Sequence, residues 1–283
     1  MSQSQPLPLW PHLPAVLQRV VAHTWCALLL DYDGTLAPIV ADPAAARLGL
    51  AMRRVLTALV HHPHYRVAIV SGRALGDLRA RVDGTALYLA GNHGLEIVGP
   101  GVTYCHPVAS RLRLQFAALA QTLRHDLEEI PGVWVEDKSL TLSVHFRSAP
   151  AQCIPLVRCR VVRRVRSALE ARTLVLRTGK AVLEVRPRVP WDKGEAMRWI
   201  VEHMRLSMPR ASGLTVYIGD DETDEDALHV LHATGLGIVV GSDRLYSAAH
   251  YCIASVAQTA QFLAVLSALT WPQTAPATPE RYH

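Results

Sequence analysis

Six short stretches of the chain consist mainly of apolar residues. They span residues 25–31, 66–71, 86–90, 215–220, 236–240 and 250–254. Continuous apolar runs of this length are typical of strands that are buried on both faces of a parallel sheet. Helical stretches lie between these strands, over residues 46–61, 73–82, 193–204, 224–233 and 256–269. The alternation of strands and helices predicts an α/β core built on a parallel sheet.

The middle of the chain follows a different pattern, in which apolar and polar residues alternate. Residues 133–147 and 173–186 alternate with a period of two, which is typical of half-exposed antiparallel strands. Each stretch contains a central turn and is preceded by a helical stretch, over residues 109–129 and 155–171. The order helix, hairpin, helix, hairpin predicts a small α+β domain inserted into the α/β core.

The domain boundaries are predicted from these two patterns. The inserted α+β domain spans residues 107–189, and the core is made of residues 1–106 and 190–283. Residues 1–14 are rich in Pro, Ser and Gln, and residues 271–283 contain three prolines. We expect both of these end segments to be loose tails.

The alternation in the hairpins also predicts which side chains share a face of the inserted sheet. One face is apolar and carries Leu140, Leu142, Val144, Phe146, Leu183 and Val185. The opposite face carries His145, Arg147, Glu184 and Arg186. If helices cover the apolar face, the polar face stays open. It is then either a solvated surface or, above a catalytic core, a lid that contacts a substrate.

Length and composition limit the class of protein. The chain has 283 residues, of which half are hydrophobic and 19% are charged, and this is typical of a globular protein with one or two domains. No apolar run approaches the ~20 residues of a membrane span, and residues 1–14 carry no secretory signal pattern. The five cysteines form no Cys-x-x-Cys pair, which favours reduced thiols over zinc or disulfides. We therefore expect a cytoplasmic protein with no membrane partner.

Much of the net charge of +5 lies in and just after one predicted helix. The arginines concerned are Arg158, Arg160, Arg163, Arg164, Arg166 and Arg172. A nucleic-acid surface is one interpretation. A solvated basic face is favoured, because no aromatic or Gly-rich binding pattern accompanies the arginines. We expect no nucleic-acid partner, and the positive field would attract an anionic substrate.

Candidate chemistry begins at Asp31-Tyr32-Asp33-Gly34-Thr35, directly behind the apolar run Ala27-Leu28-Leu29-Leu30. Two carboxylates at the end of a buried strand are costly unless a metal ion or an ion pair holds them. The arrangement suits Asp31 as a nucleophile and Asp33 as an acid/base, with a magnesium ion beside them. An ordinary Asp-Gly turn after a strand is the alternative interpretation.

Three further segments place polar residues behind predicted strands or at a helix start. Asp220 and Asp221 follow a strand and offer oxygen ligands for magnesium, although an acidic helix N-terminus has the same composition. Ser71 also follows a strand and suits either phosphate oxygens or a helix cap. Lys193 opens a helix, where it would pair with the nucleophile or lie in a plain surface turn.

In chain order these segments are Asp-x-Asp-Gly-Thr, Ser-Gly-Arg, Lys and Gly-Asp-Asp. This series resembles the haloacid dehalogenase superfamily of phosphatases. The resemblance implies a Rossmann-like parallel sheet with the site at the carboxyl ends of its strands.

Longer segments resemble the trehalose-6-phosphate phosphatases more specifically. They include Gly91-Asn92-His93-Gly94-Leu95-Glu96, Val135-Glu136-Asp137-Lys138, Val144-His145-Phe146-Arg147 and Glu184-Val185-Arg186-Pro187. The resemblance implies a magnesium-dependent phosphoric monoester hydrolase of trehalose biosynthesis. Its substrate would be trehalose 6-phosphate, a small phosphorylated disaccharide, and its intermediate an aspartyl-phosphate. We expect this enzyme to act as a monomer.

The resemblance also implies a role for each candidate residue. The catalytic residues would be Asp31 as nucleophile, Asp33 as acid/base and Lys193 as phosphoryl partner. The metal ligands would be Asp31, the carbonyl of Asp33, and Asp220, with Asp221 in support. The substrate-binding residues would be Ser71, Arg73, Asn92 and His93 on the core, and Glu136, Lys138, His145, Arg147, Glu184 and Arg186 on the lid.

Two alternatives remain at this point. The first is a related sugar phosphatase with the same core and a different lid, acting on sucrose phosphate or mannosyl-3-phosphoglycerate. The second is a non-catalytic phosphosugar-binding regulator on the same fold. The intact pair Asp31 and Asp33 and the presence of Lys193 argue against the regulator.

Overall fold

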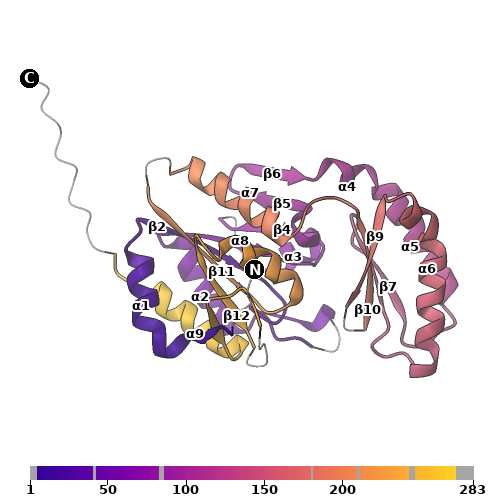
Figure 1. The fold of residues 1–283 in the computed structure, drawn as a ribbon, viewed down its shortest axis with the longest axis horizontal. Helices are drawn as coiled ribbons and strands as arrows, with labels where there is room; N and C mark the ends of the chain where they lie inside the picture. The colour runs from indigo at the N-terminus through magenta and orange to yellow at the C-terminus, as the bar shows by residue number, and fades with distance from the viewer. Residues whose placement is uncertain are drawn as a thin grey trace, which may run out of the picture.

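A nine-stranded sheet forms the centre of the larger of two domains in the computed structural model (Figure 1), which describes residues 5–40, 43–82, 86–179, 181–208, 211–241 and 246–271. The strands in spatial order are β1 (Leu7–Pro8), β13 (Tyr251–Ile253), β12 (Leu236–Val240), β11 (Gly213–Gly219), β2 (Trp25–Leu30), β3 (Tyr65–Val70), β4 (Tyr88–Gly91), β5 (Glu96–Gly99) and β6 (Val102–Cys105). The first seven strands in this spatial order, from β1 through β4, are parallel to one another. Strands β5 and β6 then extend the sheet with antiparallel pairing.

Helices cover both faces of this sheet. One face packs against α1 (Leu9–Val21), α2 (Leu50–His61), α3 (Leu75–Arg81) and α9 (Val256–Ser267). The other face packs against α7 (Lys193–Leu206) and α8 (Glu225–Leu231). In the central strand β2, alternate residues enter the two cores, so all six of its side chains are buried. This double burial explains the continuous apolar runs and confirms the predicted α/β core.

The second domain, here called the cap, has a four-stranded antiparallel sheet covered by helices. Its strands in spatial order are β7 (Trp134–Asp137), β8 (Leu142–His145), β10 (Val182–Pro187) and β9 (Leu174–Gly179). Its helices are α4 (Pro107–Arg111), α5 (Arg113–Leu127) and α6 (Ile154–Glu170). Short 3-10 turns complete the elements of both domains: Pro43–Ala45, Asn92–Gly94, Ala151–Cys153 and Glu222–Asp224.

The cap is amphipathic in the way that the hairpin pattern predicts, except at Leu140, which precedes β8 and packs in a separate cluster with Leu95 and Ala109. Val135, Leu142, Val144, Leu183 and Val185 form one core with the buried faces of α5 and α6. Figure 1 shows these two helices on the outer side and the sheet turned toward the larger domain. The predicted fold class, a parallel-sheet core with an inserted α+β cap, is confirmed, and the domain boundaries stay a prediction.

Some element predictions are wrong in detail. The single helix predicted over residues 109–129 is divided at Leu112 into α4 and α5. Strands β5 and β6 are not among the predicted strands, because most of their residues are only partly buried and form no continuous apolar run. On α6, Arg160 and Arg164 pair with Glu129 and Asp126, at and beyond the end of α5. These pairs favour a structural explanation of the basic helix.

The prediction for the N-terminal segment is wrong. Residues 1–14 were predicted to be a loose tail, but within them Leu7–Pro8 pairs with β13 and Leu9 begins α1. The tail interpretation missed that Leu9, Val16 and Val20 recur on one helical face and enter the core. Of the other predicted tail, residues 271–283, only Trp271 lies within the described residues.

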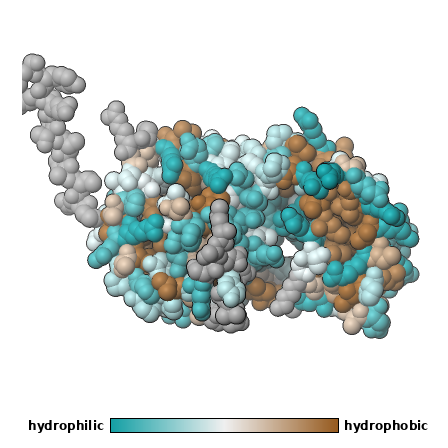
Figure 2. Space-filling model, in the orientation of Figure 1, coloured by the Kyte–Doolittle hydropathy of each residue, from teal (hydrophilic) through white to brown (hydrophobic). Residues whose placement is uncertain are grey.

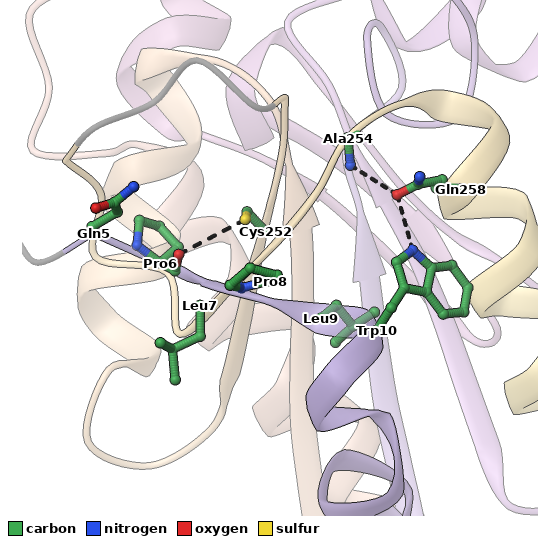
Figure 3. Close-up of a pocket in the computed structure, with 9 residues that line it drawn as sticks. All are labelled: Gln5, Pro6, Leu7, Pro8, Leu9, Trp10, Cys252, Ala254 and Gln258. Carbon is green, nitrogen blue, oxygen red and sulfur yellow. Dashed lines mark hydrogen bonds between the residues drawn. The ribbon is translucent and has the colours of Figure 1, made fainter.

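A pocket of about 600 Å³ lies at the β1 edge of the sheet (Figure 3). Leu7, Pro8, Trp10 and Gln258 are among its lining residues, and the Trp10 indole donates a hydrogen bond to Gln258. None of the predicted site residues lines it. Among the described residues, no helix has the length and apolar character needed to cross a membrane.

The N-terminal packing generates a stability prediction. Leu9 is 0% exposed and Leu7 is 50% exposed, although the two residues are close in sequence. Leu9→Ala should lower the free energy of unfolding by about 2–4 kcal/mol, because it leaves a cavity in the core. The control Leu7→Ala should cost less than about 1 kcal/mol. Urea unfolding measures both, and two equally small losses would support the tail interpretation.

Candidate active site

The site lies where neighbouring parallel strands end. Strands β3, β2 and β11 are adjacent, and their carboxyl ends lead into Ser71, Asp31 and Asp220. Parallel strands end at the same edge of a sheet, so residues far apart in sequence meet there. This edge is also the one at which the cap contacts the core.

A buried lysine joins the acidic residues at this edge. Lys193 stands at the start of α7 and is 2% exposed. Its Nζ donates to Asp31 Oδ1 and to Asp224 Oδ1, both at 2.7 Å, and lies 3.8 Å from Asp221 Oδ1. Burial alone would lower the pKa of Lys193, but the surrounding carboxylates outweigh burial and raise it. The lysine is therefore a cation in the centre of an acidic cluster.

Asp224 is a site residue that the sequence interpretation missed. It was assigned only to the start of a helix, yet its side chain is 0% exposed. It accepts hydrogen bonds from Tyr217 Oη at 2.6 Å and from the backbone N–H groups of Asp220 and Asp221 at 2.9 Å each. The sequence signal for this residue is its position three residues after Asp221, because two polar residues at this spacing can form a capping box at the start of a helix.

Three carboxylates converge closely enough to hold a metal ion. One oxygen from each of Asp31, Asp220 and Asp224 lies within 4.8 Å of the others. A Cβ at Gly34, which has a φ of +83°, would lie 2.1 Å from the Asp220 carboxylate. Glycine is thus required for Asp220 to approach the turn. Carboxylate oxygens are the ligands that Mg²⁺ prefers, so the donor set fits that ion.

The carboxylates of two predicted metal ligands, Asp221 and Asp33, lie outside this cluster. Asp221 is half exposed, and its Oδ1 caps the following turn by accepting from Thr223 and Asp224. Asp33 points its carboxylate at Arg73, with Arg73 Nε and Nη2 each donating at 2.6 Å to a separate oxygen. The predicted ligand atom of Asp33 is its backbone carbonyl oxygen, and this assignment stays a prediction.

Arg73 is itself held in place from the core side. Its Nη1 donates to Asp77 at 2.8 Å, and Asp77 also pairs with Arg81. Ser71 is buried, and its Oγ accepts from the backbone N–H of Arg73 at 3.2 Å. Together these contacts fix the side chain of Arg73 beside Asp33.

Asn92 and His93 connect the core to the cap. Both adopt positive φ values, 51° and 57°, in the turn after β4. Asn92 Nδ2 donates to the carbonyl of Lys138 at 3.0 Å, and Thr141 Oγ1 donates to Asn92 Oδ1 at 2.7 Å. His93 Nε2 lies 2.6 Å from Arg186 Nη2 and 3.4 Å from Glu184 Oε1. The polar face of the cap sheet is thus bonded to the core.

Lys138 and Glu184 form the centre of the cap network. Lys138 Nζ donates to the carbonyl of Gly72 at 3.0 Å and to Glu184 at 3.3 Å. Burial alone would raise the pKa of Glu184, but Lys138, together with His93 and Arg186, outweighs burial and holds it well below its usual range. Glu184 is therefore ionised, and Lys138 and Arg186 of the cap itself compensate its charge.

A second group of cap residues extends outward from this network. His145 Nε2 bonds to Glu136 Oε2 at 2.9 Å, and Lys138 lies 3.9 Å from Glu136. Arg147 is not brought into the group. Strand β8 ends at His145, and Arg147 is exposed, with no ion pair to the other predicted residues in the part of the chain that the structure describes. Phe146 still packs into the cap core, so the alternation continues past the strand end, and the role of Arg147 in substrate binding stays a prediction.

The fold is that of haloacid dehalogenase-like hydrolases. It superimposes on such a hydrolase from Bacteroides thetaiotaomicron with a TM-score of 0.59 and 14% identity, covering 86% of this chain and 99% of the other. The C-terminal domain of a Candida albicans trehalose-6-phosphate phosphatase gives a TM-score of 0.77 and 23% identity, covering 95% of this chain and 100% of the other. At these identities the likeness establishes the fold alone.

The sequence comparisons establish the family. Residues 29–254 match the trehalose-phosphatase family, and the chain belongs to it. A trehalose-phosphate phosphatase of Mycobacterium tuberculosis is 36% identical over 241 residues, which are 83% of this chain and 60% of that protein. A second protein of that organism, described as an uncharacterized glycosyl hydrolase, is 38% identical over 79% of this chain and 17% of its own length. The chain thus spans less than two thirds of these relatives.

The Lys193 ion pairs generate a second prediction. Without a metal ion, Lys193→Met leaves Asp31 and Asp224 buried with no cation, and should cost about 3–5 kcal/mol of unfolding free energy at pH 7. Burial already raises the pKa of both carboxyls above the unfolded value, and Lys193 opposes this rise. Removing Lys193 raises the folded-state pKa further, so lowering the pH to 5 should recover more stability in the variant than in the unmodified protein. Urea unfolding in EDTA at both pH values measures this difference.

The matched control is Arg198→Met on the exposed side of the same helix, where the side chain is 58% exposed. It should cost less than about 1 kcal/mol at both pH values. A loss in the Lys193 variant that is equally small would mean that the acidic cluster does not depend on this cation.

His93 generates a prediction about pH. Burial, supported by Arg186, lowers the pKa of His93 to about 4. In the unfolded chain a histidine titrates near pH ~6.5, so between these pH values the unfolded state binds more protons and stability falls as the pH falls. His93→Gln should remove up to about 3 kcal/mol of that pH-dependent loss between pH 7 and pH 4.

Unfolding curves across this pH range compare the variant with the unmodified protein. His125→Gln, whose side chain is 81% exposed on α5, is the control and should keep the unmodified pH dependence. Parallel curves for His93→Gln and the unmodified protein would show that His93 is not held neutral by the fold.

Proposed function

We propose that this protein is a phosphoric monoester hydrolase that converts trehalose 6-phosphate to trehalose and phosphate. The observation that carries the proposal is the buried group of Asp31, Lys193 and Asp224 at the end of the sheet, with a network of polar cap residues bonded above it. Membership of the trehalose-phosphatase family and the name of the 36% identical relative support the choice of substrate.

Asp31 is the proposed nucleophile. One of its oxygens attacks phosphorus and forms an aspartyl-phosphate, while the bond from phosphorus to the sugar oxygen breaks. Lys193 holds Asp31 Oδ1 and offsets the charge of the phosphoryl group. Ser71, at the end of β3, is the proposed hydroxyl partner of the phosphoryl oxygens.

Asp33 is the proposed acid/base. It gives a proton to the leaving sugar oxygen and then takes one from the water that attacks the aspartyl-phosphate, which frees phosphate and restores Asp31. Both oxygens of Asp33 accept from Arg73 in this structure. Proton transfer therefore requires the Asp33 side chain to turn away from Arg73 toward the substrate.

We propose Mg²⁺ as the cofactor, held by the carboxylates of Asp31 and Asp220 with Asp224 beside them. Each oxygen of Asp224 already accepts two hydrogen bonds, so Asp224 would position the site without binding the ion directly. When bound, the ion would neutralise charge on the phosphoryl group and orient it toward the nucleophile. The carbonyl of Asp33 remains a proposed ligand, and Asp221 is proposed to support the site from its capping position. Lys193 would remain beside the ion to balance the remaining carboxylate charge.

The cap supplies the proposed contacts to the sugar. Glu136, Lys138, His145, Glu184 and Arg186 present carboxylate, ammonium, imidazole and guanidinium groups on one face of a sheet, which suits hydrogen bonding to hydroxyls. Their contacts to Gly72 and His93 show the cap resting on the core, where it would exclude bulk water from the reaction. Cytoplasmic location and a monomeric state stay predictions.

The decisive experiment compares substrates and variants in one assay. Phosphate release with Mg²⁺ is measured from trehalose 6-phosphate, sucrose 6-phosphate, mannosyl-3-phosphoglycerate and glucose 6-phosphate. We expect trehalose 6-phosphate to give the highest kcat/KM, and EDTA to abolish turnover. Asp31→Asn should lower kcat by at least about 10³-fold, because no nucleophile remains, while substrate binding is retained.

The matched control is Glu202→Gln, which removes a carboxylate from the exposed side of α7 and should leave kcat unchanged. If the enzyme prefers another of these substrates, Asp31 remains the proposed nucleophile, but the sugar contacts proposed for the cap residues are wrong. Full activity of Asp31→Asn would refute the mechanism. Binding without turnover in the unmodified protein would favour the regulator.

A further inference from the structure

An exposed aromatic pair lies on the polar face of the cap sheet. The rings of Trp134 and His145 stack with centroids 3.9 Å apart and an angle of 10° between their planes. Trp134 is 44% exposed, although it is a large aromatic side chain in a strand. His145 in turn is bonded to Glu136. The stack is thus an aromatic surface at the end of a hydrogen-bonded network.

Strand register arranges the polar face in rows. Trp134 is opposite His145, and Glu136 is opposite Ser143, which is itself opposite Glu184. Successive side chains on one face are two residues apart, so the rows are separated by roughly 7 Å. Lys138 follows Glu136 by two more residues and reaches the core. From the core outward the rows are therefore Lys138, then Glu136 with Glu184, then Trp134 with His145.

This face is turned toward the core. Lys138 on this face bonds to the carbonyl of Gly72, and Arg186 on the same face bonds to His93, both on the core. The helices α5 and α6 lie on the opposite face of the sheet. Figure 2 shows an opening between the core and the cap. Of these three rows, the Trp134 row lies farthest along the strands from the contacts that Lys138 and Arg186 make to the core.

We infer that the Trp134–His145 stack binds the sugar ring that is remote from the phosphate, an inference that rests on the proposed function. A pyranose ring has an apolar face of C–H groups and an edge of hydroxyls. The ring of Trp134 offers a flat apolar surface with a negative face, and His145 and Glu136 beside it offer hydrogen-bonding groups. The phosphate must reach Asp31, so the phosphorylated ring meets the inner rows and the second ring meets Trp134.

A purely structural role for Trp134 is the competing explanation. The side chain is absent from the cap core, which is formed by the residues of the opposite face. Truncation of Trp134 therefore removes its stack on His145 but no packing from the cap core. Aromatic stacking in such an exposed position is worth enough to change affinity severalfold.

The test compares substrates with two rings and with one ring. Trp134→Ala should raise KM for trehalose 6-phosphate roughly threefold to tenfold, with little change in kcat. KM for glucose 6-phosphate, which lacks the second ring, should stay constant. Trp134→Phe, which keeps an aromatic face, should restore most of the lost affinity. Leu114→Ala, which removes an 86% exposed side chain on α5, is the control for changes on the cap surface.

Each outcome decides between the explanations. An unchanged KM for trehalose 6-phosphate, or an equal rise for both substrates, would overturn the stacking inference. If the unmodified protein does not hydrolyse trehalose 6-phosphate, the proposed function fails separately. The inference is then decided by titrating trehalose, sucrose and maltose into the unmodified protein and the W134A variant by calorimetry. Binding that is equal in both proteins, or absent from both, overturns it.

Discussion

The site depends on one buried cation. Lys193 lies between Asp31 and Asp224, and without it two carboxylates would be enclosed at the end of the sheet with no compensating charge. The placement of this cation constrains the fold, because α7 must begin beside the ends of β2 and β11. Asp224 carries the constraint further by accepting from Tyr217 and from two backbone N–H groups. The acidic cluster is therefore preorganised by the protein itself.

The contacts between cap and core extend this preorganisation to the other side of the site. Glu184 is buried and ionised because Lys138 and Arg186 surround it, and the same two residues reach Gly72 and His93 on the core. Moving the cap away would break these contacts and expose His93. The interface thus combines charge-balanced polar contacts with a small apolar cluster of Leu95, Ala109 and Leu140. Such mixed, partly polar interfaces are typical of domains that move relative to one another.

Much of the architecture was predictable from local patterns. The apolar runs identified the central strands, because double burial removes any need for polar residues in them. The alternation in the cap correctly separated Leu142 and Val144 from His145. It did not show that β8 ends at His145, because a strand end is decided by pairing partners and not by the side-chain pattern. The composition of residues 1–14 misled the tail prediction, because a Pro-rich segment concealed a helical face that begins at Leu9.

The sequence by itself determined the chemistry that is available: the motif around Asp31, the position of Lys193 at a helix start, and the family to which the chain belongs. Tertiary structure decided which of these groups meet. It placed Asp224 in the cluster, turned Asp221 into a cap and paired Asp33 with Arg73. It also stacked Trp134 on His145. Such contacts join residues that are distant in sequence, and strand register and helix packing set their distances, which no local pattern encodes.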